Sequence, residues 1–267
     1  MQSFIERSLV GIAYAAVWVI SLLYSPNLGY PVLLFVLAFV AAIEMLKLYQ
    51  IRSLALTTLL CFGTASLLVF NTPLLEIAIL SFVFQMGLTI LLFRRKTIKA
   101  NAPLASLLCI VHLLFPLLLI SEASVVDSPV FTIELTFGLL FFIWGTDAMA
   151  YSFGTLFGKT PLFRTVSPKK SIEGAIAAIL FSPVVAYINH QIFPSYSFSF
   201  WLLMGVVISV TSIIGDLVQS QCKRTAGVKD SGTILLGHGG VYDRIDSLIF
   251  TVPFVYLYLV FFSCYVS

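Results

Sequence analysis

The feature that most constrains the fold is a succession of apolar stretches, each long enough to cross a lipid bilayer. A membrane-spanning helix needs roughly 20 predominantly apolar residues, and nine stretches of this kind follow one another along the chain. Only 10% of the residues are charged, whereas soluble proteins average about 25%. We therefore predict an all-α, polytopic integral membrane protein with about nine transmembrane helices. The predicted spans are residues 8–25, 29–49, 54–71, 73–93, 103–120, 129–150, 172–190, 198–219 and 247–266.

The positions of the basic residues predict how these spans are oriented. Lys and Arg collect in the loops on the cytoplasmic side of a membrane. Of the 15, 14 precede the first span or lie in every second connection, and Lys47 lies at the end of the second span beside such a connection; the connections between carry none. This alternation places the N-terminus in the cytoplasm and the C-terminus on the opposite side. For so compact a chain we expect a multi-pass protein of the bacterial plasma membrane, or inner membrane.

The organisation of the chain is simple. We find no repeat of fixed period and no linker, and we predict a single integral-membrane domain over residues 1–267. Within it we expect an N-terminal helical bundle over residues 1–100 and a polar-lined half with the candidate site over residues 129–267. The net charge of +3 is small, so the expected partner is the lipid bilayer and not a nucleic acid. The four cysteines are scattered, without a C-x-x-C pair, and predict neither a disulfide nor a zinc site.

One dense polar insert, residues 215–246, interrupts the apolar pattern between the last two spans. It contains eight formal charges and six of the 16 glycines. Asp216 lies at the cytoplasmic end of one span, and Asp243 and Asp246 can share a face at the start of the next. Mg²⁺ is held by one or two carboxylates and substrate phosphates, and Lys and Arg neutralise phosphates. The insert therefore predicts a site for a polyphosphate and its metal, although a solvated loop would have a similar composition.

A second cytoplasmic stretch, residues 147–174, brings further polar groups. Asp147 lies at the inner end of a span, where a carboxylate costs about 2.5–3.5 kcal/mol and normally faces a cavity or a partner. Ser167, Lys169 and Lys170 precede the next span. These residues fit substrate contacts, and the two lysines fit equally well as simple charge anchors.

Polar residues inside other spans are interpreted separately. Glu44, at the inner end of the second span, could reach the cavity, with a structural role as the alternative. His112 has no acidic neighbour within the fifth span, so we expect it to bond a neighbouring helix and not to act as a ligand. Pro116 in the same span predicts a kink.

The polar insert carries a motif of fixed spacing that extends over 27 positions. Its members are Ser220, Lys223, Arg224, Lys229, Asp230, Gly232, His238, Gly239, Gly240, Asp243, Arg244 and Asp246. In this motif the chain resembles the integral-membrane phosphatidate cytidylyltransferases, or CDP-diacylglycerol synthases. Segments upstream, around Asp147 and in LFGK and SPKKSIEG, are also similar, so the resemblance covers about residues 140–250. The chain departs from the family pattern at Leu236 and Ala148, but every charged member of the motif is present.

The resemblance implies the reaction CTP + phosphatidate → CDP-diacylglycerol + pyrophosphate. The phosphate of phosphatidate is already anionic at pH 7, because its second pKa is about 6, so no general base is needed. Positioning and electrostatic stabilisation do most of the work in phosphoryl transfer. Cations that bridge the attacking and leaving oxygens would assist it.

The resemblance also implies roles for individual residues. It gives cation binding to Asp216 and Asp243, with Asp246 and Asp147 as supporting or alternative ligands, and Mg²⁺ as the cofactor, with more than one cation in the site. The residues predicted to be catalytic are Asp216, Lys223, Arg224, His238, Asp243 and Asp246. Those predicted to bind CTP and phosphatidate are Asp147, Ser167, Lys169, Lys170, Ser220, Lys229, Asp230, Gly239, Gly240 and Arg244.

Other interpretations stay open at this point. A related lipid nucleotidyltransferase or kinase with another acceptor, such as an ether lipid or a polyprenol, would have the same apolar lipid cavity. An ion-coupled transporter would explain carboxylates within spans, but it predicts charges near the middle of several helices, whereas here they gather at one face. An inactive homologue that serves as a scaffold would not need the intact charged motif. A homodimer is left open.

Overall fold

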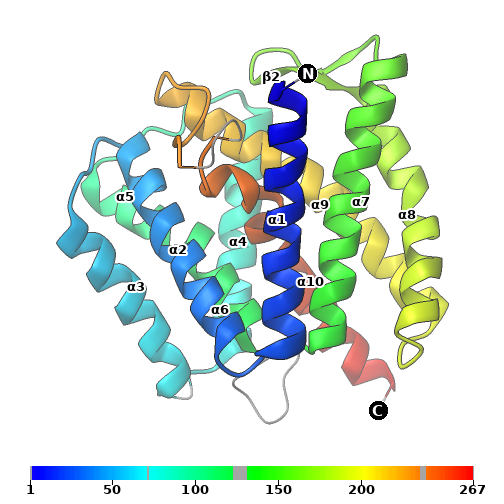
Figure 1. Ribbon diagram of the computed structural model, residues 1–267. Coiled ribbons are helices and arrows are strands. Elements are labelled where there is room, and N and C mark those ends of the chain that lie inside the picture. The colour runs from blue at the N-terminus through cyan, green and yellow to red at the C-terminus, as the bar shows by residue number, and fades with distance from the viewer. Residues whose placement is uncertain (1, 71, 123–130, 235–238, 267) are drawn as a thin grey trace.

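The computed structural model describes residues 2–70, 72–122, 131–234 and 239–266. Apart from one short hairpin, the regular elements in these ranges are helices that run between the two ends of a bundle (Figure 1). The N-terminus lies at one end of the bundle and the C-terminus at the other (Figure 1). Termini at opposite ends fit the odd number of membrane crossings that the charge pattern predicts.

The all-α prediction is confirmed. Within the described residues, six helical stretches are long and apolar enough to cross a membrane, and three further apolar helices, in α1, α3 and α10, are shorter. Together these stretches match the nine predicted spans. The helices are α1 (Gln2–Tyr24), α2 (Gly29–Leu48), α3 (Leu54–Val69), α4 (Leu74–Phe93), α5 (Ala102–Leu108), the π-helix η1 (Cys109–Leu114), α6 (Phe115–Ser121), α7 (Ile133–Phe157), α8 (Ile172–Ile192), α9 (Phe198–Thr225), the 3-10 helix η3 (Tyr242–Arg244) and α10 (Asp246–Val266). The hairpin is formed by β1 (Pro161–Phe163) and β2 (Ser167–Ser171).

Polar side chains fix where several helices begin. The residue before each of α3, α5, α7, α8 and α9 accepts a hydrogen bond from the backbone N–H three positions later, at 3.1–3.2 Å. Such caps satisfy donors that the first turn of a helix leaves unpaired. The capping residues are Ser53, Asn101, Thr132, Ser171 and Ser197.

The fifth span contains the π-helical turn η1, which ends two residues before Pro116, where the sequence predicts a kink. Proline has no backbone N–H, so the carbonyl four positions earlier loses its usual partner. Pro116 in this way frees the carbonyl of His112, and Pro253 in α10 frees that of Ile249. The Nε2 of Gln85 in α4 donates to both carbonyls, at 3.4 and 3.3 Å. His112 also pairs with Gln85 through its Nδ1, which confirms the predicted helix partner.

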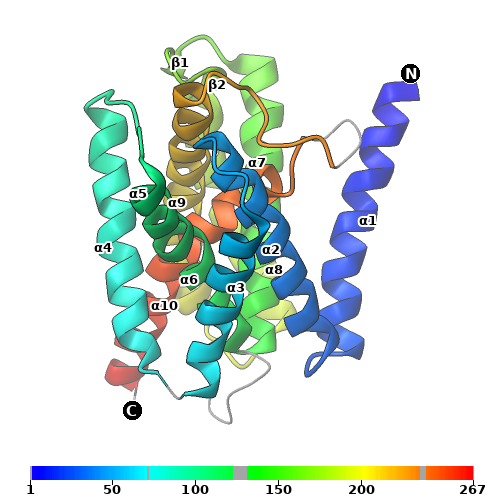
Figure 2. The same cartoon turned by 90° about the vertical axis from the view of Figure 1, so that its left-hand side faces the viewer.

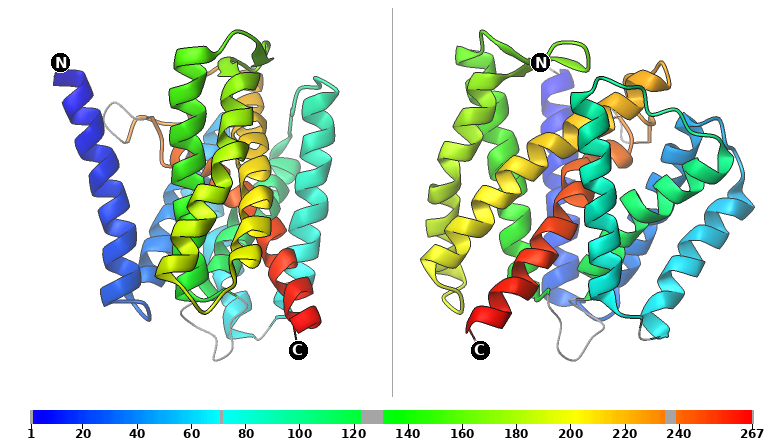
Figure 3. Two further views of the ribbon diagram at one scale, coloured as in Figure 1. Left: turned by 90° about the vertical axis from the view of Figure 1, so that its right-hand side faces the viewer. Right: turned by 180° about the vertical axis from the view of Figure 1, so that it is seen from behind.

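The helices of the C-terminal half pack closely. α7 lies against α8 and α9, α9 against α10, and α10 in turn against α4 and α6. α1 stands at the edge of the bundle beside α2 (Figures 2 and 3). Glycines permit the closest approaches, as is usual in membranes. A Cβ on Gly174 of α8 would lie 3.1 Å from the Cα of Gly154 in α7, and a Cβ on Gly215 of α9 would lie 2.5 Å from the Cβ of Phe250 in α10.

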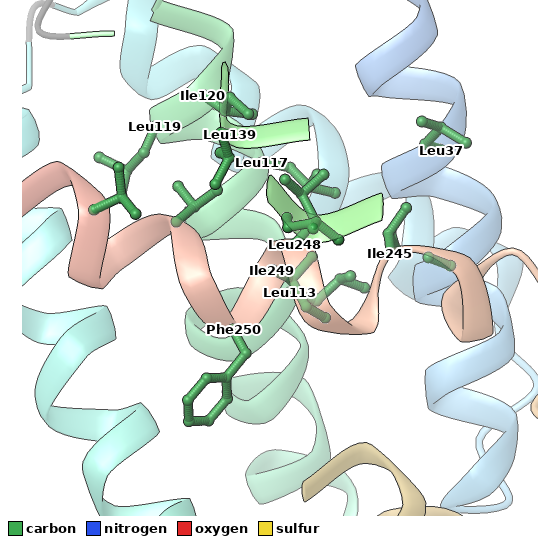
Figure 4. Close-up of a cluster of buried hydrophobic side chains, with 14 of the residues drawn as sticks. Leu37, Leu113, Leu117, Leu119, Ile120, Leu139, Ile245, Leu248, Ile249 and Phe250 are labelled. Atoms are coloured by element: carbon green, nitrogen blue, oxygen red, sulfur yellow. The ribbon is translucent and has the colours of Figure 1, made fainter. Parts of the chain in front are cut away.

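One apolar core connects the start of α10 with the rest of the bundle. Figure 4 shows side chains from this start together with leucines of α2, of the fifth span and of α7. Ile249 and Phe250 are fully buried. This packing fixes the depth of Asp246, the first residue of α10. The division into an N-terminal bundle and a polar-lined half stays a prediction.

The β1–β2 hairpin lies at the same end of the bundle as the N-terminus (Figure 1). The Glu173 carboxylate at the start of α8 accepts hydrogen bonds from the backbone N–H of Thr160 at 3.1 and 3.2 Å. From the other side, Arg224 Nε of α9 donates to the carbonyl of Val166 at 3.3 Å. These contacts hold Lys170 of β2 beside α9.

Candidate active site

A polar cavity of about 730 Å³ lies among α7, α8, the hairpin, α9, Asp230 and residues 243–246. Its volume is typical of a small-molecule site. Within the described part of the chain, every lining residue falls between positions 147 and 246. The lining residues are Asp147, Ala150, Tyr151, Gly154, Thr155, Leu162, Ser167, Lys169, Lys170, Ser171, Ala175, Ile213, Asp216, Lys223, Asp230, Asp243, Arg244 and Asp246.

Carboxylates from separate helices face this cavity: Asp147 from α7, Asp216 from α9 and Asp246 from α10. Asp216 forms an ion pair with Lys170 of the hairpin. It also accepts a hydrogen bond from Ser220 Oγ at 3.2 Å. The charge of Asp216 acts on both of the other carboxylates. The cavity therefore has an acidic side formed by three carboxyl groups, where the Lys170 ammonium pairs with Asp216.

Asp243 has a different environment, because its carboxylate accepts hydrogen bonds from several residues of the polar insert. Its Oδ1 accepts from Lys223 Nζ at 2.8 Å and from Gln219 Nε2 at 3.3 Å. Its Oδ2 accepts from the backbone N–H groups of Ser231 and Gly240, both at 2.9 Å. Burial alone would raise the pKa of Asp243, but the Lys223 ammonium and these N–H donors outweigh burial and hold the pKa below its ordinary value. Asp243 is thus ionised at neutral pH, and each oxygen already has two donors.

The basic residues of the motif also differ from one another. Lys223 and Arg244 line the cavity. Arg224 points elsewhere: its guanidinium donates to the carbonyl of Val166 at 3.3 Å and to that of Val228 at 3.0 Å. This geometry gives Arg224 a structural function between α9 and the hairpin, and its part in catalysis stays a prediction.

The cavity brings together most of the sequence-predicted site residues. Those in its lining are Asp147, Ser167, Lys169, Lys170, Asp216, Lys223, Asp230, Asp243, Arg244 and Asp246. Among the described residues, those outside the lining are Ser220, Arg224, Lys229, Gly239 and Gly240. Ser220 still contacts Asp216, and Gly240 contacts Asp243. His238 and Leu236 lie outside the described residues.

Sequence reasoning did not identify Gln219 and Tyr242. Gln219 Nε2 donates to the carbonyl of Tyr242 at 2.8 Å. Glu44, which was a candidate for the cavity, is 1% exposed and lies behind the loop, where it accepts from Tyr242 N at 2.9 Å and from Ser231 Oγ at 3.1 Å. A carboxylate inside an apolar span is a signal that could single out Glu44. A glutamine on a helix carries no comparable signal.

The donor set of the cavity fits a hard cation that substrate oxygens complete. Within the described residues, no three His, Cys, Asp or Glu side chains are arranged to hold an ion by themselves. Mg²⁺ does not need three, because it commonly takes one or two carboxylates and obtains its other ligands from phosphates and water. Asp216 and Asp246 supply such a pair from two helices, with Asp147 beside them.

The comparison with known proteins assigns the class. A sequence profile of the cytidylyltransferase family matches residues 5–262, nearly the whole chain. The chain therefore belongs to the cytidylyltransferase family.

Individual relatives are more specific. The chain is similar to the phosphatidate cytidylyltransferases of Staphylococcus saprophyticus and Staphylococcus haemolyticus, each 42% identical over 120 residues, and of Staphylococcus epidermidis, 45% identical over 120 residues. Each match covers 44% of this chain and 46% of the relative, so less than half of either protein is aligned. The family resemblance seen in the motif is confirmed.

Proposed function

We propose that this protein transfers the cytidylyl group of CTP to phosphatidate, and so forms CDP-diacylglycerol and pyrophosphate at the cytoplasmic face of a bacterial plasma membrane. The observation that carries the proposal is the polar cavity in which acidic and basic side chains from α7, the hairpin, α9 and α10 meet. The names of the staphylococcal relatives support this choice of substrates. The gathering of charges at one end of the bundle argues against an ion path across it.

The chemistry that we assign to the cavity is a displacement at phosphorus. An oxygen of the phosphatidate monoester attacks the α-phosphorus of CTP, and the bond between this phosphorus and the oxygen of the departing pyrophosphate breaks. The attacking oxygen already carries negative charge near pH 7, so no side chain has to remove a proton. The task of the protein is to hold two polyanions together in reactive geometry. We assign this task to Lys169, Lys170 and Arg244, which line the cavity.

We assign cation binding first to Asp216 and Asp246, with Asp147 as a further ligand. A divalent cation bound there would neutralise charge on the α-phosphate and on the leaving pyrophosphate. Mg²⁺ is the cation that we propose, with a second cation in the same site. Asp243, which the family resemblance also implies as a ligand, already has two donors on each oxygen. Its first role in our proposal is to anchor the loop around Gly240.

The test is a panel of lipid acceptors supplied with CTP labelled at its α-phosphate. The purified protein in nanodiscs receives phosphatidate, diacylglycerol, a polyprenyl phosphate or an ether-linked analogue of phosphatidate, and lipid-bound label is measured. We expect label on phosphatidate and its loss in Asp216→Asn, which preserves the shape of the side chain. Label on another acceptor but not on phosphatidate would assign a different lipid nucleotidyltransferase. No label on any acceptor would refute the proposal.

A further inference from the structure

Tyr242, the residue directly before Asp243, is fully buried and is held by polar groups of three different helices. Its N–H donates to Glu44 Oε2 of α2 at 2.9 Å. Its carbonyl accepts from Gln219 Nε2 of α9 at 2.8 Å. Its hydroxyl lies 3.2 Å from His112 Nε2 of the π-helix. Backbone donor, backbone acceptor and side chain of Tyr242 are thus each engaged from a different direction.

The hydrogen bonds of Gln85 determine which group donates in the hydrogen bond between the Tyr242 hydroxyl and His112 Nε2. Gln85 Nε2 faces the carbonyls of His112 and Ile249, which only accept, so this end of the amide is the NH₂ group. Gln85 Oε1 must then accept at 2.8 Å from His112 Nδ1, which therefore carries the proton. The neutral ring leaves Nε2 as an acceptor, and the Tyr242 hydroxyl donates to it. The carbonyls freed by the two prolines thus fix the tautomer that holds Tyr242.

Glu44 connects the same arrangement to the glycine-rich segment. Its Oε2 also accepts from Ser231 Oγ at 3.1 Å. Cβ atoms added at Gly232 and Gly240 would both collide with the Glu44 carboxylate. These glycines therefore allow the backbone to approach the Glu44 carboxylate closely at positions 232 and 240. Within the described residues Glu44 Oε1 has no hydrogen-bond partner. The described hydrogen bonds of this carboxylate are therefore those that its Oε2 accepts from Tyr242 and Ser231.

The N-terminal half contributes no described residue to the cavity lining, which lies between positions 147 and 246. Among the described residues, its polar contacts reach the cavity from behind the lining, through Tyr242 and through Tyr14 of α1, whose hydroxyl donates to the carbonyl of Arg244 at 3.4 Å. Buried donors and acceptors are costly to leave unpaired, so displacing Tyr242 would break three bonds at once. Asp243 follows Tyr242 directly and gathers Ser231, Gly240 and Lys223. A shift of Tyr242 would therefore move Asp243 and disturb its bonds to these three residues.

We propose that Glu44, His112 and Gln219 form a clamp on Tyr242, and that they are positioning residues for Asp243 and the loop around it. Through Glu44 and His112 of this clamp, helices that precede residue 123 set the geometry of a site whose described lining contains none of their residues. The effect on turnover rests on the proposed function, whereas the effect on the loop itself does not. Outer-shell partners that orient metal ligands change metal affinity or activity by about 10–100-fold when they are lost, and we expect an effect of this size for the clamp.

The experiment compares Tyr242→Phe, which removes one oxygen, with Tyr256→Phe as a matched control. Tyr256 is also buried and interacts with Glu122 of the same bundle. Glu44→Ala and Glu44→Gln form a second pair, since glutamine keeps an acceptor oxygen for Tyr242 N. The first measurement is hydrogen exchange of the peptide over residues 239–246 in nanodiscs. The second is kcat and KM for CTP with phosphatidate.

We expect exchange of the peptide to accelerate roughly tenfold in Tyr242→Phe and in Glu44→Ala, as the loss of a buried hydrogen bond allows. In the same variants kcat should fall about 10–100-fold with little change in KM, and Glu44→Gln should retain most of both properties. Unchanged exchange and kcat, or equal losses in Tyr256→Phe, would overturn the clamp. Faster exchange together with a wild-type protein that transfers no label would support the clamp and reject the proposed function.

Discussion

Asp243→Asn separates two roles for this carboxylate, that of a loop anchor and that of a cation ligand. Asparagine keeps one acceptor oxygen, which can serve either the N–H groups of Ser231 and Gly240 or the donors of Lys223 and Gln219. Whichever way the amide turns, its NH₂ group meets two other donors. At least two of the four bonds are therefore lost, and the Lys223 ammonium loses its negative partner.

The magnitude follows from the burial of this ion pair. The side chains of Lys223 and Asp243 are only 10% and 6% exposed, although both line the cavity, so the pair is largely buried. Breaking a buried ion pair by removal of one member costs about 3–5 kcal/mol. Because about 1.4 kcal/mol corresponds to a factor of ten, the native loop arrangement should become roughly 10²–10⁴-fold less favourable. We expect kcat/KM to fall by a factor of the same order.

The assay combines turnover with cation binding in the absence of substrate. Label transfer gives kcat/KM, and electron paramagnetic resonance follows bound Mn²⁺ as a substitute for Mg²⁺. We expect Asp243→Asn to lose turnover but to keep the Mn²⁺ affinity of the wild type, whereas Asp216→Asn should lose Mn²⁺ binding. Equal loss of Mn²⁺ binding in both variants would refute the anchoring role and make Asp243 a cation ligand.

Gly240→Ala should lower turnover, because its Cβ would collide with the Glu44 carboxylate; steady-state kinetics checks this against Gly63→Ala in α3, whose Cβ would meet nothing within 4 Å. The depressed pKa of Asp243 predicts a pH-dependent contribution to stability. It is present above the unfolded-state value of about 3.9 and is lost as the pH falls through the lower folded-state value. The difference in Tm between wild type and Asp243→Asn should therefore shrink on acidification, and a constant difference would contradict it. EDTA should abolish turnover and Mg²⁺ should restore it; label transfer in excess EDTA would exclude the cation.

The spans could be predicted because bilayer thickness fixes the length of an apolar helix. The boundaries were wrong where a helix continues into the polar end of the bundle. α7 extends to Phe157 and α9 to Thr225, beyond the predicted ends at residues 150 and 219. Hydropathy marks where the lipid ends, whereas a helix ends where other partners take over its backbone groups.

The gathering of the charged residues in one polar cavity was also predictable, but their individual contacts were not. Charges that are dense along the sequence between two apolar spans are costly to place in lipid, and a shared polar cavity keeps them out of it. The contacts that organise the loop come from far away: Glu44 meets Tyr242 across 198 positions and His112 meets it across 130. The fold also decides which charged side chains already have partners within the protein, as Arg224 has in the carbonyls of Val166 and Val228. A motif of fixed spacing does not contain this information.

The destination of the label of CTP decides whether cytidylyl transfer takes place in this cavity. Purified protein in nanodiscs that contain phosphatidate is given CTP labelled at the α-phosphate in one reaction and at the γ-phosphate in another. We predict that the α label enters the lipid and that the γ label is released as pyrophosphate. A γ label in the lipid would indicate a kinase, and the absence of any transfer by the wild-type protein would contradict the account.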